Sequence, residues 1–379
     1  MIERSFWHRR IEAAWEESPI VWLSGVRRSG KTTLAEGLGS DRALYVDCDL
    51  PAVEEMVRDP RLFFGQCAKP VVVFDEIHQL RDPARVLKIA ADRFPGLKVL
   101  ATGSSTLAAS AKFRDTLAGR KRSVVLRPVL WSELEAFRVP LTTRLLHGGL
   151  PPALLAVSKR DSFYREWLDS FFSRDIQRLF GFRDVNRFTA FFEYVLRQSG
   201  GQFETTKASR AVGIARATVE SHLRALEITH AITVVRPFHG GSKAEIIRQP
   251  KVYGFDTGFV TFARGWNPLR MEDLGVLWEH VVLEQLLSWF PDRPPLYWRD
   301  KKGREIDFVC VRDRDAVDAI ECKWDPAAFD PDALSAFRLA HPVGRNFVVA
   351  PGAMPSYPRR FGDLEVTVCT PAGLFTDDK

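Results

Sequence analysis

Residues 20–38, IVWLSGVRRSGKTTLAEGL, join an apolar strand to a helix through a glycine-rich loop. Gly25, Gly30, Lys31 and Thr32 fit the spacing G-x-x-x-x-G-K-[ST], in which main-chain N–H groups surround phosphates. Lys31 is expected to reach the β and γ phosphates, and the Thr32 hydroxyl is expected to bind Mg²⁺. The segment therefore predicts a nucleotide site in which Lys31 is catalytic. The other loop residues expected to contact nucleotide are Arg28, Ser29 and Thr33.

An acid pair at the end of a second apolar strand agrees with this site. Residues 69–80, KPVVVFDEIHQL, place Asp75 and Glu76 after four apolar residues. We expect Asp75 to hold the magnesium shell and Glu76 to polarise the attacking water. Apolar runs ending in acids are common at strand ends, but the distance from the glycine loop favours the functional interpretation.

A third strand, residues 97–105 (LKVLATGSS), ends in polar residues. It could lie between the other two strands and carry a side chain that senses the water. Thr102 and Ser104 are the candidates, and Ser104 is also a candidate nucleotide contact. Strand exits are often rich in Thr, Gly and Ser for turn reasons alone, so both interpretations stay open.

Arg120 follows Gly119 just before another apolar strand. Such an arginine could act catalytically as a finger on the γ-phosphate, often of a neighbouring subunit. The alternative is a surface arginine in a basic turn with Lys121 and Arg122.

Residues 304–324, REIDFVCVRDRDAVDAIECKW, predict two strands near the C-terminal end. Strand alternation puts Asp307, Glu321 and Lys323 on one face, and Glu279 lies in the preceding predicted helix, residues 270–290. This pattern resembles the PD-(D/E)xK nuclease fold. There Asp307, Glu321 and Glu279 would hold a divalent cation, and Lys323 would help activate a water. Amphipathic hairpins often show the same letters with nothing bound, and such folds also serve as binding modules.

Composition bounds the protein class. The chain has 379 residues, 45% hydrophobic and 27% charged, with net charge +6 and five scattered cysteines. These values predict two or three globular domains with free thiols in a reducing cytoplasm, and they permit an anionic partner without requiring one. We find neither an apolar run of 18 residues nor a secretory leader, so we expect no membrane partner.

The middle of the chain supplies the elements that connect the two predicted sites. Residues 141–185 predict a helical lid or linker, whose aromatic stripe, Phe163, Trp167, Phe171 and Phe172, is interpreted as a core face. Basic residues near it, including Arg174 and Arg178, are interpreted as a solvated face.

Residues 186–255 have the pattern of a winged helix-turn-helix, in which two short helices meet at Gly213 before a β-branched strand. Val212, Val219, Leu223 and Leu226 are expected to pack its helices. Arg216, Thr218 and Ser221 are expected to face outward on the recognition helix, with Lys207 and Arg210 available for phosphates. In some ATPases such a module is a lid or a protein contact, so DNA binding is one of two interpretations.

The segments GVRRSGKTT, FDEIHQL, ATGSS and LAGR resemble, in this order, a family of bacterial and archaeal AAA+-like ATP-binding proteins. The downstream segments GGLPPALL, FFSRDIQRLFG, KVYGFDTGF and LGVLWEHVVLEQLL also look like that family. The resemblance implies an α/β P-loop ATPase domain over residues 1–140 and a C-terminal domain of unknown function, here interpreted as nuclease-like over residues 256–379. Family members are expected to carry Gln where His78 stands, which leaves the role of position 78 open.

The preferred function is Mg²⁺-dependent ATP hydrolysis coupled to binding or remodelling of nucleic acid, DNA more than RNA, by a homo-oligomer. One alternative is a signalling or protein-remodelling switch that does not act on nucleic acid. Another is a metal-dependent nuclease gated by ATP.

Overall fold

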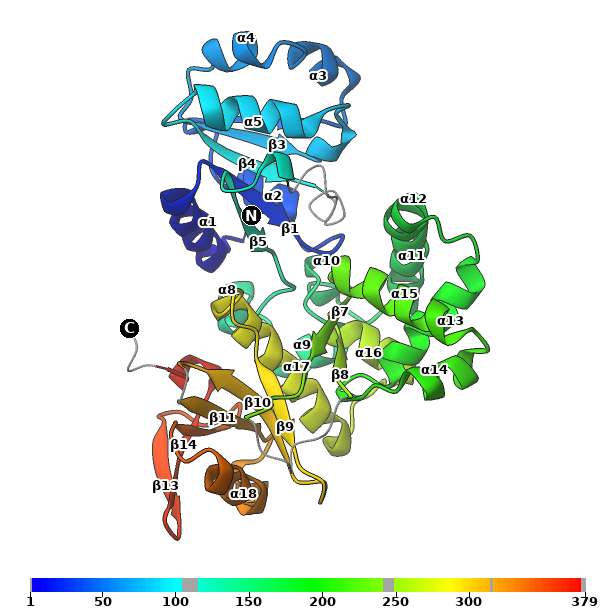
Figure 1. The fold of residues 1–379 in the computed structure, drawn as a ribbon, viewed down its shortest axis with the longest axis vertical. Helices are drawn as coiled ribbons and strands as arrows, with labels where there is room; N and C mark the ends of the chain where they lie inside the picture. The colour runs from blue at the N-terminus through cyan, green and yellow to red at the C-terminus, as the bar shows by residue number, and fades with distance from the viewer. Residues whose placement is uncertain (1, 104–114, 241–248, 314–315, 376–379) are drawn as a thin grey trace.

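A computed structural model describes residues 2–103, 115–240, 249–313 and 316–375. It places a parallel sheet at one end of the molecule, a helical region in the middle and a mixed sheet at the other end (Figure 1). The first sheet and its helices contain the glycine loop, so they are described first.

The N-terminal region is an α/β layer structure around a five-stranded parallel sheet in the order β2-β3-β4-β1-β5. The inner strands β1, β3 and β4 are nearly continuous apolar runs because both of their faces are covered, whereas the edge strand β5 is partly exposed. Val72 and Phe74 pack on one face, whereas Val71 and Val73 pack on the other. The strands are β1 Ile20–Ser24, β2 Ala43–Asp47, β3 Val71–Asp75, β4 Lys98–Thr102 and β5 Lys121–Val125. The helices are α1 Ser5–Glu17, α2 Lys31–Glu36, α3 Pro51–Met56, α4 Pro60–Gly65, the 3₁₀ turn η1 Ile77–Gln79 and α5 Pro83–Arg93.

The middle region is mainly helical and ends in a three-stranded antiparallel sheet in the order β6-β8-β7. Its first part comprises η2 Trp131–Glu133, α8 Leu134–Phe137, α9 Leu141–His147, α10 Pro151–Leu154, α11 Asp161–Phe171, the π-helical turn η3 Phe172–Gln177 and α12 Arg178–Phe180. Its second part comprises α13 Val185–Arg197, β6 Gly201–Gln202, α14 Thr205–Val212, α15 Arg216–Ile228, β7 Ile232–Val235, β8 Lys251–Gly254 and α16 Thr257–Arg264.

Most of the expected packing positions of this region lie in one hydrophobic cluster. Trp167, Phe171 and Phe172 of the aromatic stripe are buried. Val219 and Leu226 are buried as well, while Val212 and Leu223 pack against the same cluster. Gly213 has φ 71°, a left-handed conformation that suits glycine between two helices. The predicted core faces of this region are therefore confirmed.

The C-terminal region is a six-stranded mixed sheet in the order β13-β14-β12-β11-β10-β9. Strands β9, β10 and β11 are antiparallel neighbours, whereas β12 runs parallel to β11. The predicted order of helix, three strands, helix and strand is found. The elements are α17 Met271–Trp289, β9 Leu296–Arg299, β10 Glu305–Val311, β11 Val317–Cys322, η4 Pro326–Ala328, α18 Asp332–Ala340, β12 Asn346–Val349, β13 Tyr357–Phe361, β14 Leu364–Cys369 and η5 Pro371–Gly373.

The hydrophobic core continues across the expected boundary at residue 256. One cluster of buried side chains includes Trp167 of α11, Phe191 of α13, Trp278 of α17 and Phe347 of β12. Helix α16 packs against α9 and α13, so this helix belongs to the middle region. The middle and C-terminal regions are thus joined by shared apolar packing.

All five cysteines are free thiols, as predicted. Within the described ranges, no helix combines the length and the apolar character that crossing a membrane requires.

Candidate functional site

The glycine loop, residues 25–32, connects β1 to α2 in a conformation that needs its glycines. Gly25 has φ 140°, and a Cβ atom there would lie 2.4 Å from the carbonyl oxygen of Leu126. Gly30 has φ 94° directly before α2. Both positions therefore favour residues without a side chain.

Lys31 folds back over its own loop. Its Nζ donates to the carbonyl oxygens of Gly25 at 3.0 Å and Val26 at 3.2 Å. Burial lowers the pKa of the Lys31 ammonium, partly offset by nearby Glu76 and Asp175. A phosphate bound in the loop would supply negative counter-charge to this buried ammonium.

Asp75 is the centre of a hydroxyl network at the end of β3. Its Oδ2 accepts hydrogen bonds from the hydroxyls of Thr32 at 2.8 Å and Tyr45 at 2.6 Å. Its Oδ1 accepts from the Thr102 hydroxyl. Hydroxyl and carboxylate oxygens are the hard ligands that Mg²⁺ prefers, so Thr32 and Asp75 fit the predicted magnesium role.

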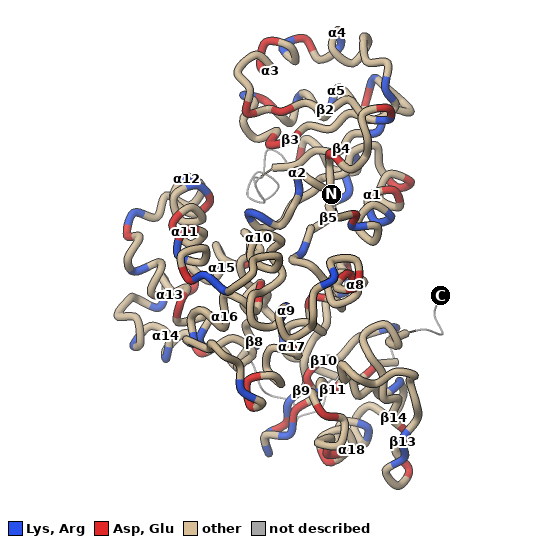
Figure 2. Tube along the Cα trace, turned by 180° about the vertical axis from the view of Figure 1, so that it is seen from behind, with Lys and Arg blue, Asp and Glu red and all other residues tan. Residues whose placement is uncertain are grey.

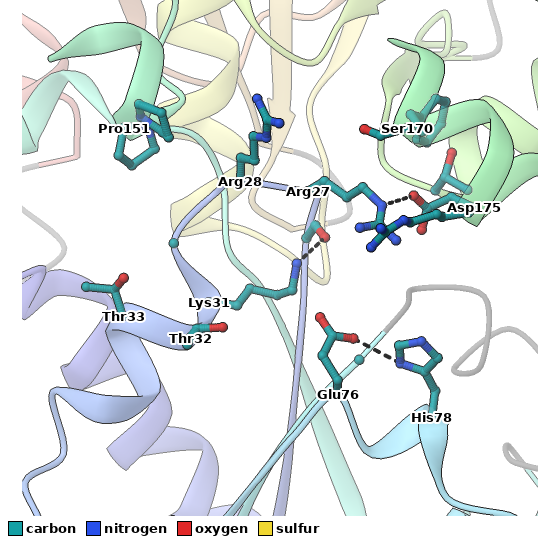
Figure 3. A pocket seen from close by; sticks show the side chains of 17 residues that line it. Arg27, Arg28, Lys31, Thr32, Thr33, Glu76, His78, Pro151, Ser170 and Asp175 are labelled. Carbon is teal, nitrogen blue, oxygen red and sulfur yellow. Dashed lines mark hydrogen bonds and ion pairs between the residues drawn. The ribbon is translucent and has the colours of Figure 1, made fainter. Parts of the chain in front are cut away.

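Glu76 adopts a left-handed conformation, φ 51° and ψ 42°, which is uncommon for a residue with a side chain. Its N–H donates to the Thr102 hydroxyl at 2.9 Å, which gives that predicted candidate a positioning contact. Its Oε2 lies 3.0 Å from Nδ1 of His78. Burial raises the pKa of the Glu76 carboxyl, but the contacts with His78 and Lys31 outweigh burial and lower it overall. His78 thus holds the side chain of the predicted water-activating acid (Figure 3).

Lys31, Thr32, Glu76 and His78 line a cavity of about 510 Å³. Lys31, Arg27 and Glu76 point into the same space from different elements (Figure 3). The middle region closes the cavity with residues from α10, α11 and η3. Those lining residues are Pro151, Pro152, Ser170, Phe171, Arg174 and Asp175.

Arg27 and Asp175 form a contact that sequence reasoning missed. Arg27 Nε lies 2.5 Å from Asp175 Oδ2, and Trp167 Nε1 donates to the Arg27 carbonyl oxygen at 3.0 Å. Arg174, interpreted from sequence as part of a solvated face, is exposed and also lines the cavity. The adjacent charges in FFSRDIQ were a signal, but their partner lies 148 positions away.

A second cavity of about 470 Å³ lies on the other side of the glycine loop. It shares Gly30, Thr33 and Pro151 with the first cavity. The remaining lining residues are the apolar Ile2, Leu34, Phe137 and Leu155, together with Glu3, Arg4, His8 and Gly37. The two cavities together offer one polar and one more apolar space around a single loop.

Arg4 binds the main chain of the glycine loop through its guanidinium. Its guanidinium pairs with the Glu133 carboxylate at 2.7 Å and donates to the Ser29 carbonyl oxygen at 3.0 Å. It also donates to the carbonyl oxygens of Arg127 and Pro128. Both members of the ion pair are 6% exposed, so this contact is part of the interior.

Among the described residues, Ser29, Asp75 and Arg120 are predicted nucleotide-site residues that do not line the cavity. Arg120 pairs with Asp92 of α5 at 2.6 Å on the surface and does not line the cavity. A finger role for Arg120 on another subunit stays a prediction. Ser104 lies outside the described residues.

In the C-terminal region, two residues of the predicted acidic site, Glu279 and Glu321, form ion pairs with lysines. Lys323 Nζ lies 2.7 Å from Glu321 Oε2 and 3.9 Å from Asp307 Oδ2. The Cys322 N–H donates to Asp307 Oδ2 at 2.8 Å. Burial, reinforced by neighbouring carboxylates, raises the pKa of Asp307 to about 6 and that of Glu321 to about 8.

Glu279 is bound by a residue that the sequence did not single out. Lys251 Nζ lies 2.8 Å from Glu279 Oε1 and 2.7 Å from Glu305 Oε1, and the Tyr253 hydroxyl also donates to Glu279. Within the part of the chain that the structure describes, no three His, Cys, Asp or Glu side chains are grouped to hold a metal ion. Lys251 pairs with Glu279, and Lys323 pairs with Glu321 and lies near Asp307, so a cation role for these three carboxylates stays a prediction.

The predicted recognition helix, α15, exposes Arg216 and Ser221, while Thr218 is half-buried. Arg210 on α14 is exposed. Lys207 is also exposed but pairs with Glu204 at 2.8 Å. The outward-facing positions expected from the helical period are thus found for Arg216 and Ser221.

Comparison with known proteins bears on the first cavity. Residues 17–135 match the family model of an AAA domain. Residues 139–270 and 274–369 match two domains of unknown function, DUF8612 and DUF4143. The predicted order, an ATPase domain first and a domain of unknown function last, is confirmed, and the AAA match implies ATP binding.

Two uncharacterized mycobacterial proteins are similar to most of the chain. Rv2008c of Mycobacterium tuberculosis and Mb2031c of Mycobacterium bovis are each 28% identical over 317 residues, which is 81% of this chain and 71% of the relative.

Solved structures resemble the chain only loosely. The RuvB Holliday junction branch migration motor of Thermotoga maritima has a TM-score of 0.31 at 17% identity, covering 61% of this chain and 89% of that one. A signal transduction ATPase with numerous domains from Pyrococcus horikoshii has a TM-score of 0.27 at 12% identity, covering 76% and 45%. The AAA-domain match is therefore the comparison on which the functional argument depends.

Proposed function

We propose that the protein hydrolyses ATP in the cavity around Lys31, in a reaction that requires Mg²⁺. The observation that carries this proposal is the convergence of Lys31, the Thr32–Asp75 pair and Glu76 on one cavity beside a glycine loop. Bound Mg²⁺ would neutralise phosphate charge, held by Thr32 and Asp75. Lys31 would bind the terminal phosphates, and Glu76, held by His78, would orient and polarise the attacking water.

The second cavity supports the choice of a nucleotide over a smaller phosphate compound. It adjoins the phosphate side through Gly30, Thr33 and Pro151 and offers apolar side chains such as Leu34 and Phe137. Flat, largely apolar rings bind well in such spaces. The base and the ribose would occupy this cavity.

Coupling to nucleic acid is the second part of the proposal. Helices α13–α15 with the sheet β6-β8-β7 have the elements of a winged helix, and Lys and Arg recur along the outer helices α12–α14 (Figure 2). Helix α15 leads directly to the ATP cavity, since Thr229 lines it and His230 Nε2 lies 3.5 Å from the Ser24 hydroxyl. One helix therefore joins the surface proposed for DNA to the nucleotide site.

The C-terminal region is proposed as a nuclease-like contact surface that does not cut. Its order of helix, three strands, helix and strand supports the likeness in fold. Lys251 and Lys323, paired with Glu279 and Glu321, offset part of the carboxylate charge without a metal. Cleavage gated by ATP is the competing possibility.

The test is an ATPase and cleavage assay on the full chain with single-stranded, duplex and branched nucleic acids. We expect Lys31→Ala to lose nucleotide binding and hydrolysis. We expect the parent turnover to rise with DNA and to fall back steeply with added salt. Turnover indifferent to every nucleic acid would contradict the coupling. Metal-dependent nicking lost in both Asp307→Ala and Lys323→Ala would establish the nuclease instead.

A further inference from the structure

Arg27 has an unusual place for a residue of the glycine loop. Its side chain extends across the cavity to Asp175 in η3 rather than away from the nucleotide space (Figure 3). Arg27 and Asp175 both line the cavity that Lys31 and Glu76 line. The pair is thus inside the proposed reaction site.

Charged side chains of both signs line the cavity around this pair, and Arg28 and Arg174 add to the positive ones. Arg27 and Lys31 are positive, whereas Glu76 and Asp175 are negative. Burial raises the pKa of Asp175, and the charge of Arg27 opposes that rise. A triphosphate entering beside Lys31 would add negative charge next to the Asp175 carboxylate. Arg27 would then be attracted by two competing anions.

The main chain of Arg27 is held while its side chain has room to change partner. Trp167, which is buried, donates from Nε1 to the Arg27 carbonyl oxygen at 3.0 Å. The Arg27 side chain is 33% exposed. A guanidinium on a fixed main chain can exchange one anion for another without moving the loop.

We propose that Arg27 is a catalytic residue that contacts the γ-phosphate from within the same chain, and that Asp175 is its partner when no γ-phosphate is bound. This inference rests on the proposed ATP hydrolysis and adds to it the source of positive charge. Arg120 does not line the cavity, so a finger role for Arg120 would need a second subunit, whereas Arg27 is already in place.

The exchange also provides a path from the nucleotide to the middle region. Asp175 belongs to the π-helical turn Phe172–Gln177, and such turns are rare and frequent at functional sites. Loss of the Arg27 contact would release this turn from the glycine loop. The turn lies between α11 and α12, and α12 is followed by α13 of the proposed winged helix.

The experiment compares the parent, Arg27→Ala, Arg27→Lys and Asp175→Asn as full-length chains. Calorimetry measures binding of ADP and of a non-hydrolysable ATP analogue, steady-state kinetics measure kcat and KM, and hydrogen exchange follows residues 161–180. Arg58→Ala is the control, because Arg58 forms an exposed pair with Glu55 at 2.9 Å.

We expect Arg27→Ala to lower kcat by about 100-fold or more, as the loss of an arginine finger does. It should also lose most of the preference for the ATP analogue over ADP, and Arg27→Lys should keep part of both properties. Asp175→Asn should bind the analogue several-fold more tightly, leave ADP binding unchanged and show raised hydrogen exchange at residues 172–177 without nucleotide. In the parent, only the analogue should raise that exchange.

If the parent hydrolyses ATP while Arg27→Ala matches it in kcat and in analogue preference, the inference is overturned and the proposed function stands. If the parent neither binds nor hydrolyses ATP, both are overturned. Should Arg27→Ala fail to fold, an Asp175→Asn variant with unchanged analogue affinity and unchanged exchange would overturn the inference.

Discussion

The Lys251 ammonium on β8 lies 2.8 Å from Oε1 of Glu279 on α17, which joins the middle region to the C-terminal region by a buried charge. The same ammonium lies 2.7 Å from Glu305 on β10, and the Lys251 side chain is 4% exposed. Three elements from two regions therefore meet at one cation. The charge pattern of the proposed nuclease-like surface depends on a residue outside that region.

Replacing Lys251 with Met should lower the free energy of unfolding by about 3 kcal/mol, because two largely buried carboxylates would lose their counter-charge. Urea denaturation of the full chain measures the change. Lys207→Met is the matched control, since its pair with Glu204 has the same 2.8 Å distance but is exposed. The control should leave the free energy of unfolding nearly unchanged, because exposed ion pairs contribute little. Equal effects of the two substitutions would show that Lys251 does not stabilise the junction.

Glu76→Gln should bind ATP as the parent does and should lower kcat by about 100-fold or more, because the amide cannot polarise water as the carboxylate does. Calorimetry and a phosphate-release assay separate the two effects. Glu55→Gln changes an exposed glutamate of the same region and should leave both unchanged. Normal turnover in Glu76→Gln would remove this residue from its proposed role.

Arg216→Ala should weaken DNA binding and reduce the slope of log affinity against log salt by about 0.9, the effect of one lost phosphate contact. Titrations at four salt concentrations measure the slope. Arg360→Ala removes an exposed arginine of β13 that pairs with Glu365 and serves as the control. A slope equal to that of the parent would place the DNA surface elsewhere.

Stability should fall as pH rises from about 4.5 through 7, in part because of Glu284. Burial raises the pKa of this carboxyl to about 7, although Arg144 pairs with it. The folded state therefore holds a proton that the unfolded state has released. The stabilisation is complete below the unfolded pKa and is lost as pH passes the folded pKa.

Denaturation of the parent and Glu284→Gln across pH 4–9 checks this. The substituted protein should show a flatter profile, with a difference in slope of at most about 1.4 kcal/mol per pH unit. Parallel profiles for the two proteins would mean that Glu284 does not titrate in this window.

The local geometry of the proposed ATP site could be predicted because it depends on short, continuous segments of the chain. A strand, a glycine loop and a helix fix where Lys31 and Thr32 lie, and the exit of the next apolar strand fixes Asp75. The parallel register Asp47↔Asp75 places that acid at the edge of the sheet. Similarly, helical spacing was enough to predict the burial of Val219 and Leu226.

The contacts that modify the sites could not be predicted, because they join residues far apart in the chain. Arg27 meets Asp175 across 148 positions, and Lys251 meets Glu305 across 54. Such pairs depend on how helices and sheets pack, which spacing within one segment does not determine. For this reason, the sequence pattern of the C-terminal region did not reveal that Lys251 pairs with Glu279.

The contact of Arg4 with the carbonyl of Ser29 means that the nucleotide loop is shaped before any nucleotide arrives. Nucleotide binding would then cost little conformational entropy in the loop. The affinity for nucleotide should therefore depend more on charge than on ordering of the loop. A shortened chain that starts after Arg4 would lose this contact.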